Sequence, residues 1–291
     1  MNISNAMGEL LITPMTPSDL AVMVEWFARD GLNPGLQAST LYEAFEDGTM
    51  LVGRVRGERA AAMMGTRYDG GYGMVGPGAV NPAFRGRGYG HAMLAAVLEQ
   101  LGEGPLAADL PAELVLPAGR MGFEHRYHGV RMRGTVGLRA ALPSDGMAVV
   151  PVASVAHESL MRYDQEVTGM VRPLFLQRWL DQGDAAGLAL LDEHDGLGGY
   201  AFVRACRVGY RIGPLFANDA ACAYRLFDAL CARVGWGQAI FIDVPDLNPA
   251  AMALAADREL AAIATAPRMV RGTIPATRID RVFGVTNWLG P

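Results

Sequence analysis

The sequence predicts an α/β (α+β) protein built as two consecutive domains of one kind, each a mostly antiparallel mixed sheet flanked by helices. The 291 residues suit two domains of common size, and the 51% hydrophobic content supplies two cores. Two short strings also recur in the same order at nearly the same spacing, which indicates a tandem duplication. They are Asp109-Leu110-Pro111 with Asp243-Val244-Pro245, and Arg133-Gly134-Thr135-Val136 with Arg271-Gly272-Thr273-Ile274.

The seam of the duplication is predicted near residues 142–146, where the turn formers Pro143, Ser144, Asp145 and Gly146 cluster between apolar segments. We therefore expect an N-terminal domain over residues 7–141 and a C-terminal domain over residues 145–291.

The first half has the element order β-α-α-β-β-β-α-β-α-β. Its first helix is typical of a capped start, because Thr16 can cap, Pro17 takes the first helical position and Asp19 follows three residues after the cap. An apolar repeat over residues 20–27 predicts that this helix buries one face. We expect further helices at 40–46 and 89–101, strands at 9–13, 50–55, 60–68, 72–80 and 106–110, and a closing hairpin that ends near 136.

The second half repeats this order. We expect strands at 149–153, 188–191, 200–205, 210–215 and 240–244, and helices at 155–163, 173–180, 220–234 and 248–256.

Composition excludes several classes of chemistry and partner. All 25 basic residues are arginine, so lysine Schiff bases and P-loops are excluded. The net charge is −5 with no basic surplus in either half, which argues against nucleic acid as a partner. The apolar runs are shorter than the roughly 20 residues that cross a bilayer, and no signal-peptide pattern opens the chain.

The cysteines and histidines predict neither a disulfide framework nor a metal site. Cys206, Cys222 and Cys231 are odd in number and are not spaced like zinc ligands, which fits free thiols in a reducing cytoplasm. The five histidines show no ligand spacing beyond His125-x-x-His128, so we expect no metal.

A glycine-rich turn between a predicted strand and a predicted helix carries the strongest chemical signal. Gly86, Gly88 and Gly90 alternate there, so backbone N–H groups can be exposed at the positive end of a helix dipole, a geometry that binds phosphate. The dinucleotide fingerprint is excluded because His91 stands where its last glycine would be, and no lysine completes a Walker loop. The alternative is a flexible surface turn whose arginines aid solubility.

The pattern Arg85-x-x-Gly88-x-Gly90 on this strand-turn-helix resembles the acyl-CoA loop of the GCN5-related N-acetyltransferase (GNAT) superfamily. The resemblance covers the whole first half, including the pair Gly122-Phe123 after the last helix. The tandem layout, with Asp-x-Pro on each fifth strand, is similar to two-domain bacterial members.

The resemblance implies that the fourth and fifth strands splay apart and that acetyl-CoA, as co-substrate, inserts its pantetheine arm between them. An amine would attack the thioester directly, and a main-chain amide of the fourth strand would stabilise the oxyanion. Arg85 and Arg87 would reach the outer phosphates, including the 3′-phosphate. The implied cofactor-binding residues are Gly78, Ala79 and Val80 for the pantetheine arm and Arg85, Gly86, Arg87, Gly88, Tyr89 and Gly90 for the phosphates.

The groups that transfer protons are less clear. Many members of the family have a tyrosine four residues before the glycine of the Gly-Phe pair, where this chain has Ala118. Asp109 is the main candidate for binding or deprotonating the amine, and its alternative is a cap for the next helix. Tyr89 is a second catalytic candidate. Tyr72, Glu113 and His125 are weaker ones, whose alternatives are packing or the surface.

The second half departs from the loop pattern. Residues 216–221 contain neither glycine nor arginine and include Asp219, so we expect a GNAT-like domain that does not bind CoA. It would cover part of the acceptor site or stabilise the first domain. The acidic stretch Tyr163-Asp164-Gln165-Glu166, expected in a helix connection, could attract a cationic amine or be a solvated loop.

The expected function is transfer of an acetyl group from acetyl-CoA to a primary amine of a small molecule, by a monomer or a homodimer. An acyl-CoA-binding sensor or scaffold without turnover is the alternative, motivated by Ala118. A third interpretation is an ordinary nucleotide-binding α/β domain.

Overall fold

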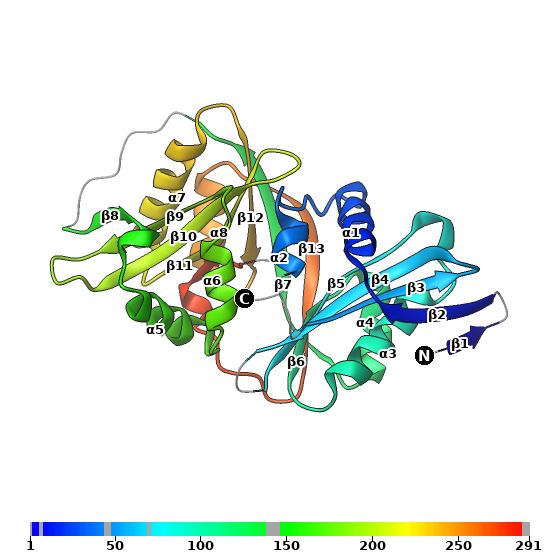
Figure 1. The fold of residues 1–291 in the computed structure, drawn as a ribbon. Coiled ribbons are helices and arrows are strands. Elements are labelled where there is room, and N and C mark those ends of the chain that lie inside the picture. Colours follow the sequence, from blue (N-terminus) through cyan, green and yellow to red (C-terminus); the bar gives the residue numbers. More distant parts are fainter. Residues whose placement is uncertain (1, 6–7, 44–47, 69–70, 138–145, 287–291) are drawn as a thin grey trace. The chain divides into compact units, whose positions relative to one another are not determined.

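A computed structural model describes residues 2–5, 8–43, 48–68, 71–137 and 146–286 (Figure 1). The chain forms two compact units. Unit 1 comprises Met1–Arg126 and Pro267–Ile274, and unit 2 comprises Tyr127–Ala266 and Pro275–Pro291. None of the helices within the described ranges combines the length and the apolar composition that a bilayer crossing requires.

Unit 1 contains a sheet with helices on both faces. Its strands follow the order β1-β2-β3-β4-β5-β6, and the end of β13 follows β6. The elements are β1 (Asn2–Asn5), β2 (Gly8–Pro14), α1 (Pro17–Arg29), α2 (Ala38–Glu43), β3 (Thr49–Val55), β4 (Glu58–Arg67), β5 (Gly73–Val80), the 3-10 turn η1 (Pro82–Phe84), α3 (Tyr89–Leu101), β6 (Leu106–Asp109), α4 (Ala112–Arg120) and β13 (Ala261–Arg271).

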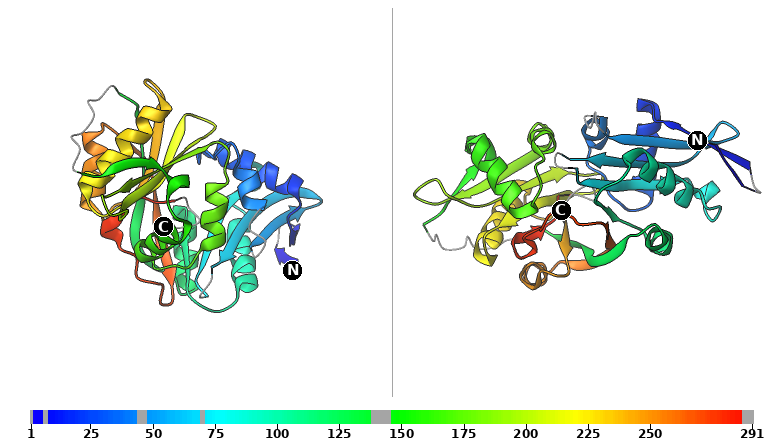
Figure 2. Two further views of the ribbon diagram at one scale, coloured as in Figure 1. Left: turned by 60° about the vertical axis from the view of Figure 1, so that its left-hand side comes forward. Right: turned by 90° about the horizontal axis from the view of Figure 1, so that it is seen from below.

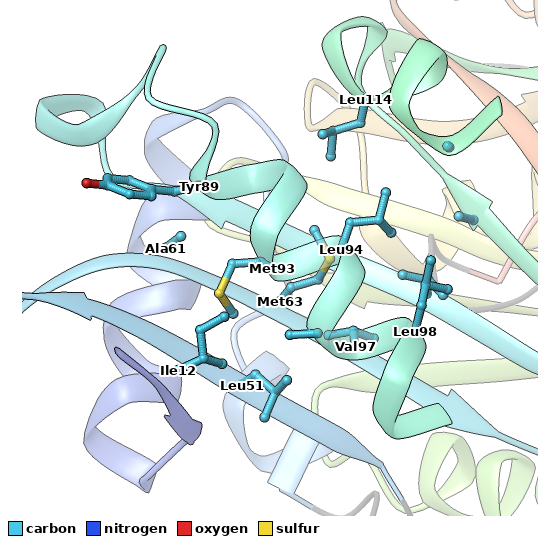
Figure 3. Packing of buried hydrophobic residues seen from close by; sticks show 14 of the residues in the cluster. Ile12, Leu51, Ala61, Met63, Tyr89, Met93, Leu94, Val97, Leu98 and Leu114 are labelled. Atoms are coloured by element: carbon cyan, nitrogen blue, oxygen red, sulfur yellow. The ribbon is translucent and has the colours of Figure 1, made fainter. Parts of the chain in front are cut away.

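Alternation along β4 separates the two cores of unit 1. Ala61 and Met63 belong to the cluster that α3 covers, whereas Ala62 and Met64 belong to the cluster of α1 and α2. This is the period-2 pattern of a strand buried on both faces. Figure 3 shows the α3 cluster, in which Met93 and other side chains of the helix meet those of the strands.

The capped start predicted for the first helix is confirmed. The Thr16 side chain accepts a bond from the Asp19 amide, and the Asp19 carboxylate accepts one from the Thr16 amide at 2.9 Å. Arg54 and Arg59 also donate to Asp19, at 2.6 and 2.5 Å. Burial of Asp19 opposes ionisation, but the hydrogen bonds from Arg59, Thr16 and Arg54 outweigh it and hold the pKa of Asp19 well below its usual range. The first helix is thereby tied to β3 and β4.

Unit 2 repeats the architecture with its own sheet, in the order β7-β12-β11-β10-β9-β8, with β14 also paired to β11. Helix α7 packs on β9, β10 and β11 (Figure 2). The elements are β7 (Glu124–Thr135), β8 (Ala148–Pro151), the 3-10 turn η2 (Val152–Ser154), α5 (His157–Thr168), α6 (Pro173–Leu180), β9 (Ala185–Leu191), β10 (Leu197–Ala205), β11 (Tyr210–Ala217), α7 (Ala220–Val234), β12 (Ala239–Pro245), α8 (Pro249–Asp257), η3 (Ile279–Arg281) and β14 (Val282–Gly284).

The compact units differ from the predicted domains 7–141 and 145–291, because the two halves exchange their closing strands. In unit 1 the end of β13, from the second half, pairs with β6, so that Arg268 lies opposite Asp109. In unit 2 the strand β7, from the first half, pairs with β12, so that Arg131 lies opposite Asp243. Turn formers mark a connection but do not say which sheet the flanking strands join. Most of the predicted seam, residues 142–145, lies outside the described residues.

A buried ion pair joins each exchanged strand to its new sheet. Arg268 donates from Nε and Nη2 to the two carboxylate oxygens of Asp109, both at 2.7 Å, and both side chains are at most 5% exposed. Arg131 binds Asp243 in the same way, at 2.7 and 2.9 Å. Burial of Asp243 opposes its charge, but Arg131 and Arg211 outweigh that effect and lower the pKa of this carboxyl. The recurrent aspartates of the sequence are therefore partners of exchanged arginines.

Replacing Asp109 with Asn should lower the free energy of unfolding by about 3 kcal/mol, because the Arg268 charge would stay buried without its counterion. Urea denaturation followed by circular dichroism measures this change. The matched control is Asp280→Asn, whose partner pair with Arg278 is 61% and 54% exposed and should shift the midpoint little. The double variant Asp109→Leu with Arg268→Met should regain most of the loss; equal effects of the two Asn variants would contradict the assignment.

Candidate functional site

Strand β5 separates from β6 partway along its length. The two strands pair in parallel only at Gly73, Met74 and Val75. Beyond these residues the register between β4 and β5 shifts, at the position of Gly76-Pro77. The remaining residues, Gly78–Val80, pair with β4 alone.

The free side of this segment, which we call the β5 edge (Gly78–Val80), carries unpaired backbone groups. The Asn81 amide donates to the carbonyl of Ala60 on β4. Backbone groups alternate in direction along an antiparallel strand, so those of Gly78 and Val80 point away from β4. The β5 edge can therefore accept an extended chain that offers hydrogen bonds.

The loop after β5 turns its amides outward at the start of α3. Gly86 and Gly88 adopt φ angles of 74° and 80°, and Gly88 caps α3 without a side-chain bond. The amides of Gly86, Gly88, Tyr89 and Gly90 have no hydrogen-bond acceptor among the described residues. A Cβ built on Gly86 or Gly88 would meet nothing within 4 Å, so the space in front of these amides is open. Such a concave set of donors at a helix N-terminus favours an anion.

The two arginines of the loop differ in their contacts. Arg85 donates from Nε to the Val80 carbonyl at 3.0 Å and from Nη2 to both carboxylate oxygens of Asp30, at 2.5 and 2.7 Å. Arg87 is exposed, and its guanidinium lies 5.4 Å from the centre of the Phe84 ring. Arg85, predicted to reach outer phosphates, is thus held by the protein in this structure.

Asp109 has a structural partner that the sequence did not reveal. It does not cap the next helix, because the N-cap of α4 is Pro111, so the capping alternative is wrong. Nor does its setting support the predicted catalytic role, since both carboxylate oxygens accept bonds from Arg268. A carboxylate matched to a buried guanidinium is poorly suited to bind or deprotonate an amine.

The other catalytic candidates lie in the core or on the surface. The hydroxyl of Tyr89 is buried and has no hydrogen-bond partner in the described part of the chain (Figure 3). Tyr72 is buried and donates to the sulfur of Met74 at 3.3 Å. Ala118, at the family's tyrosine position, is completely buried in the α3 cluster. Glu113 and His125 are exposed.

In unit 2 the edge that corresponds to the β5 edge is filled by the chain itself. Strands β11 and β12 also pair in parallel over only three residues, which end at Ile212. Beyond them β14 pairs with β11, with Gly284 opposite Leu215 and Val282 opposite Phe216. The Val285 amide then donates to the carbonyl of Asp243 on β12 at 2.9 Å. The segment around β14 therefore closes the gap between the two strands.

The start of α7 carries a carboxylate where α3 presents open amides. Asp219 caps the helix by accepting a bond from the Cys222 amide at 2.9 Å. Arg281, next to β14, binds Asn218 and Glu166. Donors and space that an anionic ligand would need are occupied by side chains.

The acidic stretch around Asp164 is neither a solvated loop nor a helix connection, because it lies within α5. Asp164 is buried, accepts bonds from Arg172 at 2.8 and 2.7 Å, and accepts another from the hydroxyl of Tyr200 at 2.5 Å. Burial and the neighbouring Asp164 raise the pKa of Tyr200 well above its usual value. The charge of Asp164 is neutralised inside unit 2, so it does not attract an amine.

Replacing Gly284 with Val should destabilise the protein by about 2 kcal/mol, because added methyl groups overpack a filled core. Even a Cβ at this position would lie 2.8 Å from the Cδ1 atom of Ile242, and both Ile242 and Leu215 are fully buried. Gly137→Val is the matched control, since a Cβ there meets nothing within 4 Å. Thermal or urea unfolding measures both variants, and equal stability would contradict the tight packing of β14.

Comparisons with known proteins place both halves in one superfamily. Residues 20–107 match the model described as acetyltransferase (GNAT) family, and residues 160–284 match the model described as acetyltransferase (GNAT) domain. The chain is also similar to the holothin acyltransferase of Pseudoalteromonas sp. (strain SANK 73390), with 24% identity over 235 residues, 81% of this chain and 79% of that protein.

Solved structures share the fold at low identity. A Pyrococcus horikoshii protein assigned to the acetyltransferases superposes with a TM-score of 0.79 at 20% identity, over 99% of this chain and 98% of that one. A GCN5-related N-acetyltransferase from Sphaerobacter thermophilus gives a TM-score of 0.62 at 16% identity, over 92% and 98%. The tandem GNAT protein of the clavulanic acid biosynthesis pathway gives 0.63 at 16%, over 92% and 99%. With a GNAT match in each half, this chain is a tandem member of the GCN5-related N-acetyltransferase superfamily, a family of acyltransferases that use acyl-CoA as co-substrate.

Proposed function

We propose that the chain transfers an acetyl group from acetyl-CoA to a primary amine of a small molecule, and that unit 1 holds the acetyl-CoA. The observation that carries this proposal is the set of outward-facing amides at Gly86, Gly88, Tyr89 and Gly90, at the start of α3. Dipole and donors together suit a diphosphate.

The β5 edge supports the same placement. An extended pantetheine arm carries amide groups, and the backbone groups of Gly78 and Val80 that point away from β4 could pair with them. The distance along the chain from this edge to the loop is short, so one ligand can span both. Arg87, exposed beside the loop, is available to approach a phosphate.

The reaction needs no protein nucleophile. The nitrogen lone pair of the neutral amine attacks the thioester carbonyl carbon, a C–N bond forms, and the C–S bond then breaks to leave a thiolate that takes up a proton. An outward amide of the β5 edge could stabilise the oxyanion. Because a free alkylamine has a pKa near 10, an acceptor with a lower pKa would react with less help from a base.

The small-molecule amine is favoured by the relative named holothin acyltransferase, which covers 81% of this chain. At 24% identity the acceptor itself is not carried over. The buried thiols Cys206 and Cys222 fit a reducing cytoplasm.

A sensor or scaffold that binds acyl-CoA without turnover is the second candidate. It is favoured by the catalytic candidates themselves: Asp109 is paired with Arg268, Ala118 replaces the family's tyrosine, and the Tyr89 hydroxyl is buried.

Calorimetric titration with CoA should give one site per chain, because β14 and Asp219 occupy the corresponding positions in unit 2. Gly88→Leu should abolish this binding, since its side chain would fill the space in front of the amides. Gly57→Leu is the control, because Gly57 also has a positive φ, 84°, with nothing within 4 Å, but lies in the β3–β4 turn. Two sites per chain, or normal affinity in Gly88→Leu, would argue against this assignment of the loop.

Release of free thiol from acetyl-CoA, measured across a panel of small primary amines, separates the enzyme from the sensor. We expect turnover with at least one amine and none with Gly88→Leu. A blank without acetyl-CoA corrects for the three cysteines of the chain. Tight binding of acetyl-CoA with no thiol release on any amine would select the sensor.

A further inference from the structure

Asp30 occupies a position that helix stability alone does not explain. It is the C-cap of α1, and its amide bonds to the carbonyls of Trp26 and Ala28. The end of a helix carries a partial negative charge, so an acidic side chain there is unfavourable unless a cation is close. That cation is Arg85, which binds both carboxylate oxygens of Asp30.

Arg85 also covers part of the β5 edge. Its Nε donates to the Val80 carbonyl at 3.0 Å, and this carbonyl points away from β4. The guanidinium thus satisfies a backbone acceptor on the side where the pantetheine arm is proposed to lie. The same side chain leaves the main chain one residue before Gly86, where the outward amides begin.

We propose that Asp30 and Arg85 form a latch on the acyl-CoA site, an inference that rests on the proposed function. Without ligand, Asp30 holds the guanidinium against Val80. When CoA binds, Arg85 leaves both partners and turns to the diphosphate, so the Asp30 carboxylate competes with phosphate for one cation. Asp30 acts through Arg85 and is a positioning residue that weakens CoA binding and favours release of the product.

The exposure of the pair suits a contact that opens. The Arg85 and Asp30 side chains are 48% and 30% exposed, so water screens their attraction. Exposed pairs of this kind change an equilibrium by about two- to five-fold. A diphosphate carries more charge than one carboxylate and meets the helix dipole as well, so it can displace Asp30 from the guanidinium.

The test is a double-variant cycle on CoA affinity by calorimetry. Asp30→Asn should tighten binding about three-fold, because the competitor is removed. Arg85→Gln should weaken it about ten-fold. In the Arg85→Gln background, Asp30→Asn should change nothing. Glu103→Gln, which removes one negative charge beyond the far end of α3, controls for general attraction of the anionic ligand and should leave the affinity nearly unchanged.

Each outcome decides the matter. A wild-type chain that binds CoA, together with unchanged or weaker binding in Asp30→Asn, overturns the latch and leaves the proposed function standing. The same tightening in the presence and absence of Arg85 also overturns it, because Asp30 would then act independently. If neither the wild type nor Asp30→Asn binds CoA, the proposed function fails and the latch fails with it.

Discussion

The buried pairs Asp109–Arg268 and Asp243–Arg131 are the interactions on which the rest of the structure depends. Each joins a strand from one half of the sequence to the sheet formed by the other half. Neither sheet is complete without its exchanged strand, and each exchanged strand carries a charge that only one partner can neutralise. Since removing one member of a buried pair costs far more than an exposed pair gains, the pairs fix the register of β13 on β6 and of β7 on β12. The end of β6, beside the β5 edge, is fixed by the same contact.

Duplication gave the two units the same gap between strands, and their sequences treat it differently. In unit 1 the backbone groups of the β5 edge face away from β4, and glycines keep the space before α3 open. In unit 2 the segment containing β14 pairs with β11, and Asp219 caps α7. Both sets of contacts satisfy the same backbone groups, once with a place for a ligand and once with the chain itself. This difference supports a tandem protein with one acyl-CoA site.

Local signals made much of the fold predictable, and long-range pairing was beyond them. The capped start at Thr16 and the loop around Gly88 were predicted because capping and glycine spacing are local properties. The recurrence of Asp109 in the second half was visible, but its partner Arg268 was not, because a partner across an exchanged strand leaves no spacing rule. The recurrent Gly-Pro pairs, Gly76-Pro77 and Gly213-Pro214, were a missed signal, since they mark where each strand bends away from its neighbour.

Glycine amide resonances offer the most direct test of the central claim, that the loop before α3 binds the diphosphate of CoA. In a protein labelled with ¹⁵N-glycine and titrated with CoA, the amides of Gly86, Gly88 and Gly90 should shift in a saturable manner. Those of Gly213 and Gly284, at the filled gap of unit 2, should keep their positions. Shifts confined to Gly213 and Gly284, or none at the three loop glycines when CoA is saturating, would contradict the account.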